Sequence, residues 1–206
     1  MMSLDDSKSM RDSGCVDIAL QSLVLITKSL EKLEAGELSV VGFGEESRII
    51  HRFEEPLTRE AGSTIIQSFT FNQDKTNVKD MLTHTFQVLE EARSQSRSKE
   101  DVWQLQLILS DGICDEHDSV ASLVSHAADM RIMCVFIVLD TRIERDSIVK
   151  MATVEYTQNE RGESELKMKR YMDSFPFEYY IVLRDINGLP LVLAETLRQY
   201  LSYVNT

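Results

Sequence analysis

The sequence predicts an α/β fold in which a mostly parallel central sheet carries helices on both faces. Short runs rich in Val, Ile, Leu or Phe alternate along the chain with longer segments of helical period. Two of these runs, 105–109 and 132–139, are almost continuously apolar, which is typical of parallel strands buried on both faces. The chain has 206 residues, of which 43% are hydrophobic and only 3 are Pro, which is enough for one large domain with a real core.

The predicted strands are short. In chain order they are 1–4, 38–43, 47–53, 103–109, 132–139 and 179–183. The fourth and fifth contain the continuous apolar runs, so we expect them at the centre of the sheet.

The predicted helices lie between these strands. Apolar residues recur at three- and four-residue spacing from Val16 to Leu30, and Gly36 ends this pattern. The same spacing runs from Val78 to Ala92, and segments 120–130 and 191–203 complete the set. Sheets of this kind bind ligands at the carboxyl ends of their strands, so the residues that follow each strand are candidates for function.

One long segment, from 153 to 177, is polar and charged and shows no apolar period. Its composition predicts a charged loop insertion in a single domain that spans 1–206. A connection of this length is uncommon in a compact domain and is usually functional or disordered.

The charge of the chain excludes two classes of partner. The sequence has 22 basic and 34 acidic residues, which gives a formal net charge of -12. A protein that wraps nucleic acid or coats an anionic membrane needs a basic face, so we expect no direct nucleic acid and no membrane as partner. A basic or metal-bridged protein partner remains possible.

The cysteines indicate the redox compartment of the protein, and the apolar runs and the first residues bear on membrane insertion and secretion. Cys15, Cys114 and Cys134 form no CxxC pair and lie in apolar or helical stretches, so we expect buried free thiols in a reducing compartment. No apolar run approaches the roughly 20 residues that cross a bilayer, and the first residues do not resemble a signal peptide. We expect the chain to be a fragment of a larger protein.

Acidic and hydroxyl side chains follow two of the predicted strands. Asp5, Ser7 and Ser9 come directly after the first strand, and Asp111 follows the fourth. Adjacent parallel strands would bring both groups to the same edge of the sheet. Carboxylate and hydroxyl oxygens without His or Cys suit a hard cation, Mg²⁺ in particular or Mn²⁺. Two aspartates only balance a divalent charge, so the cation could still capture a carboxylate from outside.

The same residue types also have a purely structural role. Asp and Ser after a strand are common as helix caps and turn formers, and a single Asp-x-Ser-x-Ser motif is more often a cap than a metal site. Both motifs occur here at the ends of apolar strands, in the expected order within an α/β pattern. That combination favours the metal site.

These motifs resemble the Rossmann-like von Willebrand factor A fold and its metal-ion-dependent adhesion site (MIDAS). Asp5, Ser7 and Ser9 match the first motif of that family, and Asp111 matches its later aspartate. The family uses a Thr from a separate loop as a further ligand. The best candidate here is Thr76, which lies just before the helix predicted from Val78, and Thr70 is the alternative. We expect Asp6, Lys8 and Met10 to lie at the rim of the site.

A narrower resemblance is to the carboxy-terminal MIDAS domain of the midasin family, dynein-like AAA+ ATPases that remodel ribosome precursors. It is carried by segments 5–10, 110–112 and 171–180, the last of which contains Asp-Ser-Phe-Pro-Phe. The resemblance implies a docking domain that is not itself an enzyme, with ATP bound and hydrolysed by modules outside these residues.

The same resemblance implies the partner and the location of the protein. The expected partner is a ubiquitin-like domain of a ribosome assembly factor on the pre-60S particle, and an acidic side chain of this partner would complete the Mg²⁺ coordination. The ATPase would then supply force for removal of the factor. The expected location is the nucleus, in the nucleolus and nucleoplasm.

Three alternative functions compete with this interpretation. The acidic pair Asp5 and Asp6 suits an Mg²⁺-dependent phosphoryl-transfer or receiver-like domain, but the turn after the fifth predicted strand, 140–142, has no lysine for the phosphate. An extracellular adhesion domain of the same fold is disfavoured by the odd number of cysteines and the absence of a signal peptide. A nucleophilic pair of Cys114 and His117 is less expected than a buried thiol and a helix-surface histidine.

Overall fold

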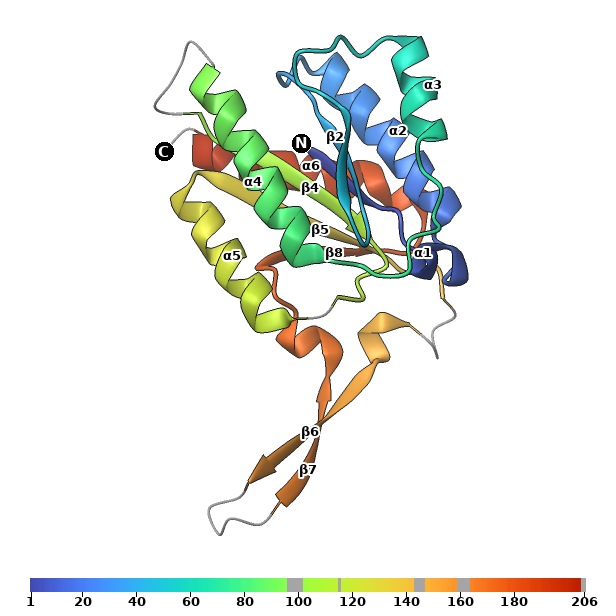
Figure 1. The fold of residues 1–206 in the computed structure, drawn as a ribbon, viewed down its shortest axis with the longest axis vertical. Helices are drawn as coiled ribbons and strands as arrows, with labels where there is room; N and C mark the ends of the chain where they lie inside the picture. Colours follow the sequence, from blue (N-terminus) through green and yellow to red (C-terminus); the bar gives the residue numbers. More distant parts are fainter. Residues whose placement is uncertain (96–101, 115, 143–146, 159–163, 205–206) are drawn as a thin grey trace.

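The central sheet of the computed structural model confirms the predicted α/β class. The structure describes residues 1–95, 102–114, 116–142, 147–158 and 164–204. Within these ranges, the strand order is β3-β2-β1-β4-β5-β8, and all neighbours are parallel except β2 and β3 (Figure 1). The strands are β1 Met2–Asp5, β2 Val40–Phe43, β3 Ser47–His51, β4 Gln104–Ser110, β5 Ile132–Leu139 and β8 Tyr179–Leu183.

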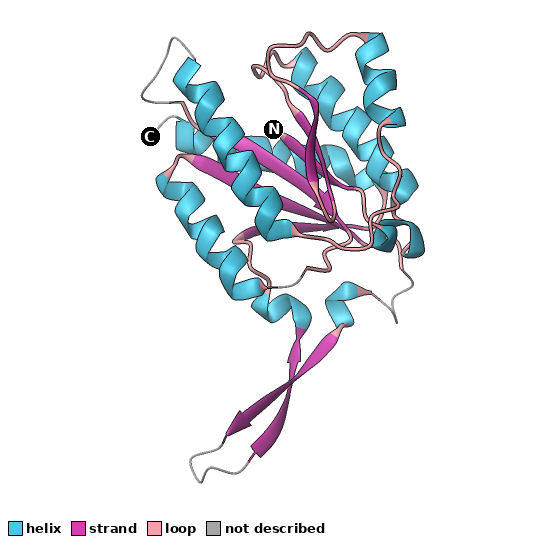
Figure 2. Ribbon diagram, viewed as in Figure 1, coloured by secondary structure: helices cyan, strands magenta, loops and turns pink. Residues whose placement is uncertain are grey.

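Helices cover both faces of this sheet, as Figures 1 and 2 show. α4 and α5 pack on one face, and α1, α2, α3 and α6 pack on the other. The helices are α1 Lys8–Asp12, α2 Val16–Lys32, α3 Arg59–Gln67, α4 Val78–Gln95, α5 His117–Asp129 and α6 Leu189–Val204, and the short 3-10 helices are η1 Ile148–Lys150, η2 Tyr171–Ser174 and η3 Ile186–Gly188. No helix in the described ranges is long and apolar enough to span a membrane.

The side chains of β5 divide between two hydrophobic cores. Val135 and Ile137 face the core under α2 and α6, whereas Phe136 and Val138 face the core under α4 and α5. Every residue of the strand is buried, because each face of the sheet has its own helical layer. All three cysteines are also buried, and they form no disulfide, as the sequence predicts.

The segment predicted as a charged loop contains a β-hairpin, so that expectation was wrong for its described part. β6 Ala152–Gln158 pairs antiparallel with β7 Ser164–Arg170, and η2 follows directly. The hairpin projects from the body of the molecule in Figure 1. Apolar and polar residues do alternate in 153–157 and 165–169, but the many charges hide this period-two pattern. The centre of the predicted loop, 159–163, lies outside the described residues.

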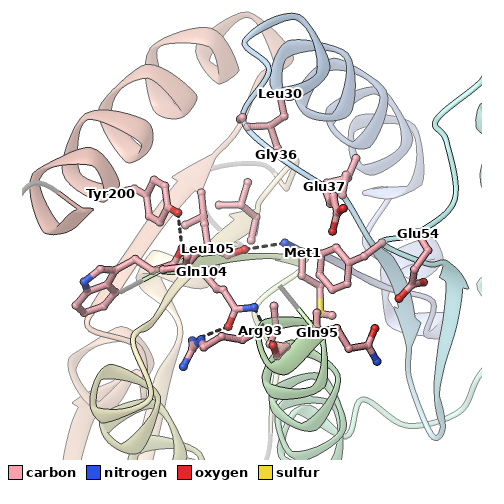
Figure 3. A pocket seen from close by; sticks show the side chains of 18 of the residues that line it. Met1, Leu30, Gly36, Glu37, Glu54, Arg93, Gln95, Gln104, Leu105 and Tyr200 are labelled. Carbon is pink, nitrogen blue, oxygen red and sulfur yellow. Dashed lines mark hydrogen bonds between the residues drawn. The ribbon is translucent and has the colours of Figure 1, made fainter. Parts of the chain in front are cut away.

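A cavity of about 680 Å³ lies at the amino ends of β1 and β4 (Figure 3). Its wall includes Arg93, which donates a hydrogen bond of 2.6 Å to Gln104, and Tyr200, which donates one of 2.6 Å to the carbonyl of Trp103. None of the strand-end residues of the predicted metal motif lines it. The motif therefore lies at the opposite ends of these strands.

Candidate metal centre

The two acidic motifs meet at neighbouring strand ends. β1 and β4 are parallel neighbours, and their register pairs Leu4 with Leu109. The next residue of β4, Ser110, donates a hydrogen bond of 2.6 Å to Asp5 Oδ2. Asp111 follows immediately, and both carboxylates are buried, with 0% of Asp5 and 1% of Asp111 exposed. The predicted meeting of these strand ends is therefore confirmed.

The turn after β1 brings two hydroxyls together. The amide of Ser7 donates a hydrogen bond of 2.9 Å to Asp5 Oδ1, and the hydroxyl oxygens of Ser7 and Ser9 lie 2.9 Å apart. Ser7 occupies the N-cap position of α1, yet its side chain makes no capping hydrogen bond. The capping role that these residue types suggest is thus not the role of the Ser7 hydroxyl.

The turn after β4 fixes the second carboxylate. Gly112 has a φ of +83°, and a Cβ built there would lie 2.7 Å from Cδ1 of Ile148, so the chain turns where a side chain does not fit. The amide of Ile113 donates to Asp111 Oδ1 at 3.3 Å. The guanidinium of Arg142 donates to Asp111 Oδ2 at 3.2 Å.

Burial makes the negative charge at this site costly. It raises the pKa of Asp5 to about 7, and the nearby charge of Asp111 adds to the rise, although hydrogen bonds from Ser110 and Ser7 oppose it. Burial also raises the pKa of Asp111, against a hydrogen bond from the following loop and the charge of Arg142. A divalent cation between the two carboxylates would favour their charged forms.

The donor set fits a hard divalent cation with few charged ligands. Within the described ranges, no group of three or more His, Cys, Asp or Glu side chains is arranged so that it could hold a metal ion. A metal at this edge would take its ligands from the carboxylates of Asp5 and Asp111, the hydroxyls of Ser7, Ser9 and the predicted Thr76, and water. Oxygen ligands of this kind are those that Mg²⁺ and Mn²⁺ accept.

The loop that carries Thr76 lies against the turn after β1. The amide of Lys8 donates to the carbonyl of Gln73 at 2.8 Å, and the amide of Asn77 donates to the carbonyl of Gly44 at 2.8 Å. These contacts anchor both ends of the short segment that contains Thr76. Its role as a ligand stays a prediction, as do the roles of the other four residues.

Asp6 does not line the rim of the site, contrary to the expectation. Its side chain is buried, and its Oδ1 accepts hydrogen bonds from the amides of Thr70 at 2.7 Å and Phe71 at 2.5 Å. Its Oδ2 pairs with Arg48 at 2.8 Å. Asp6 therefore fixes the connection after α3, and it holds the backbone of Thr70, the alternative hydroxyl ligand.

The other two rim residues have different environments. Met10 is fully buried in the core under α2, so the expectation that it rims the site was wrong. Lys8 is half-exposed and forms an ion pair with Asp74 on the neighbouring loop. Helical geometry explains the difference, because Met10 lies on the inward face of the short α1.

Sequence reasoning missed the contact of Arg142 with Asp111. The turn after β5 has no lysine, yet its Arg142 places a positive charge beside Asp111. An exposed arginine after a strand is common, and the only signal was its place after a strand adjacent to β4.

Tyr171 is a second residue that the sequence did not assign to this region. Its hydroxyl lies 3.0 Å from the carbonyl oxygen of Gly112 and accepts a hydrogen bond of 3.0 Å from the amide of Cys114. His117 contacts this hydroxyl through Nε2 at 3.0 Å and the carbonyl of Ser174 through Nδ1 at 2.9 Å. The ring nitrogens of His117 thus hold η2 in place, and this histidine is not a simple helix-surface residue.

Comparison with known proteins agrees with this geometry. The von Willebrand factor type A domain family matches residues 2–163. A midasin of Dictyostelium discoideum is 31% identical over 201 residues, and a midasin of Giardia intestinalis is 29% identical over 205 residues. These matches cover 97% and 100% of this chain but span only 3% and 4% of the two midasins. The predicted resemblance to midasin is confirmed over nearly the whole chain.

Solved structures share the fold at low sequence identity. Proximal thread matrix protein 1 from the mussel byssus has a TM-score of 0.62 and 13% identity, over 95% of this chain and 45% of that chain. A further structure of the mussel protein, with a TM-score of 0.53 and 13% identity over 95% of this chain and 46% of that chain, is described with a zinc-occupied MIDAS motif. At such identity the likeness supports the fold alone. Because the family matches most of its length, the chain belongs to the von Willebrand factor type A domain family.

Proposed function

We propose that this domain is a metal-dependent protein-docking module. A divalent cation, Mg²⁺ or Mn²⁺, binds to Asp5, Ser7, Ser9 and Asp111, with Thr76 as the further hydroxyl ligand. The observation that carries the proposal is the meeting of two buried carboxylates with two hydroxyls at the ends of β1 and β4.

Charge balance favours docking over catalysis. The carboxylates of Asp5 and Asp111 neutralise a divalent cation, and neutral hydroxyls add no further negative charge. The cation therefore keeps an affinity for one more anion, and an acidic side chain of a partner protein supplies it. A bound cation also makes the local charge at these strand ends more positive, so an acidic side chain can dock there although the domain has a net charge of -12.

The similarity to midasin supports a partner class. On that basis the partner is a ubiquitin-like domain of a ribosome assembly factor on the pre-60S particle, and the location is the nucleus, both nucleolus and nucleoplasm. The whole protein would be an AAA+ ATPase that binds ATP in other modules and couples its force to removal of the factor. The domain itself, over residues 1–206, carries out no chemical step.

The proposal is tested by binding measurements with and without metal. Titration of ubiquitin-like domains from pre-60S assembly factors should give a saturable signal in Mg²⁺ and none after EDTA. Asp111→Ala should abolish binding, whereas Asp129→Ala, at a carboxylate exposed on α5, should retain it. Binding that survives EDTA, or that Asp111→Ala leaves intact, would contradict the metal bridge. Circular dichroism would show that both variants are folded.

A further inference from the structure

Arg142 joins the acidic edge from a third strand. It follows β5, which is the parallel neighbour of β4. One terminal nitrogen of its guanidinium lies 3.2 Å from Asp111 Oδ2, and the two side chains are 22% and 0% exposed. An ion pair at this depth is screened less by water than a pair on the surface. Arg142 therefore supplies a positively charged side chain that contacts Asp111.

The contact uses the oxygen of Asp111 that the loop leaves available. Oδ1 of Asp111 accepts a hydrogen bond from the amide of Ile113, and Oδ2 accepts one from the guanidinium of Arg142. A divalent cation bound by Asp111, directly or through water, would lie within a few ångströms of the guanidinium. Two cations at that distance repel each other, and the repulsion is strong at a site from which water is largely excluded.

We propose that Arg142 competes with the divalent cation for Asp111 and thereby sets the metal affinity of the site. This inference rests on the proposed function, because it requires a metal between Asp5 and Asp111. Metal binding separates Arg142 from Asp111, and the guanidinium turns toward solvent, to which it is already partly exposed. Metal loss returns Arg142 to the carboxylate, so a buried Asp111 is not left without a counter-charge.

The direction of the effect distinguishes this role from a supporting one. If Arg142 only positioned Asp111 as a ligand, removal of the guanidinium would weaken metal binding. If Arg142 competes, removal strengthens metal binding and destabilises the protein only when metal is absent. Competition therefore predicts that removal of the guanidinium raises metal affinity and lowers stability in the absence of metal, whereas a supporting role predicts that it lowers metal affinity.

The test is calorimetric titration of Mg²⁺, repeated with Mn²⁺, into the purified domain and its Arg142→Gln variant. We expect the variant to bind metal about fivefold to tenfold more tightly, the effect of losing one partly buried counter-charge. Arg142→Lys, which keeps the charge but not the planar fork, should lie between the two. Arg198→Gln is the matched control, because it removes the same charge from the exposed pair with Glu195 on α6 and should change nothing.

Thermal unfolding gives the second readout. In EDTA, Arg142→Gln should unfold at a lower temperature than the unmodified domain, and saturating Mg²⁺ should close or reverse this difference. If the unmodified domain binds metal but Arg142→Gln binds it equally well or more weakly, the proposed competition is wrong. The proposed metal site would still stand. Absence of metal binding in every variant would overturn the proposed function itself, and the competition with it.

Discussion

The hydroxyl of Tyr171 lies 3.0 Å from the carbonyl oxygen of Gly112, the residue directly after Asp111. The same hydroxyl accepts the amide of Cys114 at 3.0 Å, so one side chain of η2 holds two points of the turn that carries the carboxylate. Burial raises the pKa of Tyr171, so the hydroxyl is protonated at neutral pH and can donate a hydrogen bond. The base of the hairpin is thereby joined to the strand end that carries Asp111.

Tyr171→Phe should loosen this turn. The change removes the partner of the buried Cys114 amide and of the Gly112 carbonyl, which should lower the free energy of unfolding by about 1–3 kcal/mol. Metal affinity should fall as well, because Asp111 is less well fixed. Urea unfolding and Mg²⁺ titration measure the two effects. Tyr180→Phe is the control at a more exposed tyrosine of β8, and equal effects of both changes would contradict a special role for Tyr171.

Gly112→Ala tests the shape of the same turn. The new methyl group would lie 2.7 Å from Ile148 Cδ1 and 2.8 Å from Val138 Cγ1, at a φ of +83° that disfavours side chains. We expect a loss of about 2–4 kcal/mol in the free energy of unfolding. Gly62→Ala in α3, where nothing lies within 4 Å, should instead be neutral or stabilise the protein by up to about 1 kcal/mol. Chemical denaturation of both variants checks the contrast.

The role of the Ser7 hydroxyl can be determined by comparison with Thr58, whose side chain caps the N-terminus of α3. Thr58 accepts the amide of Ala61 at 3.1 Å, so Thr58→Ala should cost about 1 kcal/mol of stability and leave metal affinity unchanged. Ser7→Ala should instead lower metal affinity about tenfold, and in EDTA it should cost at most about 1 kcal/mol, because the Ser7 side chain makes no capping bond and loses only its hydroxyl contact with Ser9. A stability loss for Ser7→Ala without a change in affinity would return Ser7 to a structural role.

The raised pKa of Asp5 gives a pH dependence of defined sign. Burial raises this pKa from 3.8 to about 7, so between these values the folded protein binds a proton that the unfolded chain has released. In EDTA the free energy of unfolding should therefore fall as pH rises from about 4 to about 7, by on the order of 4 kcal/mol at most. Urea unfolding at several pH values measures this slope, and Asp5→Asn should remove most of it.

Metal binding should show the opposite trend. Because a proton on Asp5 competes with the cation, Mg²⁺ affinity should rise as pH increases from 6 to 8. A calorimetric titration at both pH values checks this, and an affinity that is independent of pH would show that Asp5 is already charged without metal.

The central strands and the metal motif could be predicted because their signals are local. β5 and β8 begin and end at the predicted residues, because the polar turns on either side of an apolar run mark where the strand begins and ends. α3 was missed because only Ile65 of its nine residues is buried, which leaves almost no apolar period. The hairpin was missed because charge obscures its alternation. The contact of Arg142 with Asp111 depends on the direction of one long side chain, which no spacing in the sequence encodes.

The position of β1 determines how this domain would respond to a force applied at the strand end that carries Asp5. β1 lies between β2 and β4, is parallel to both, and ends in the carboxylate of Asp5. A load applied along this strand is carried in shear, so the hydrogen bonds to both neighbours share it and must fail almost together. A load applied across the sheet would peel the bonds apart one at a time. Tension along β1 would therefore be shared by its hydrogen bonds to two neighbouring strands, and the carboxylate of Asp5 lies at the end of that strand.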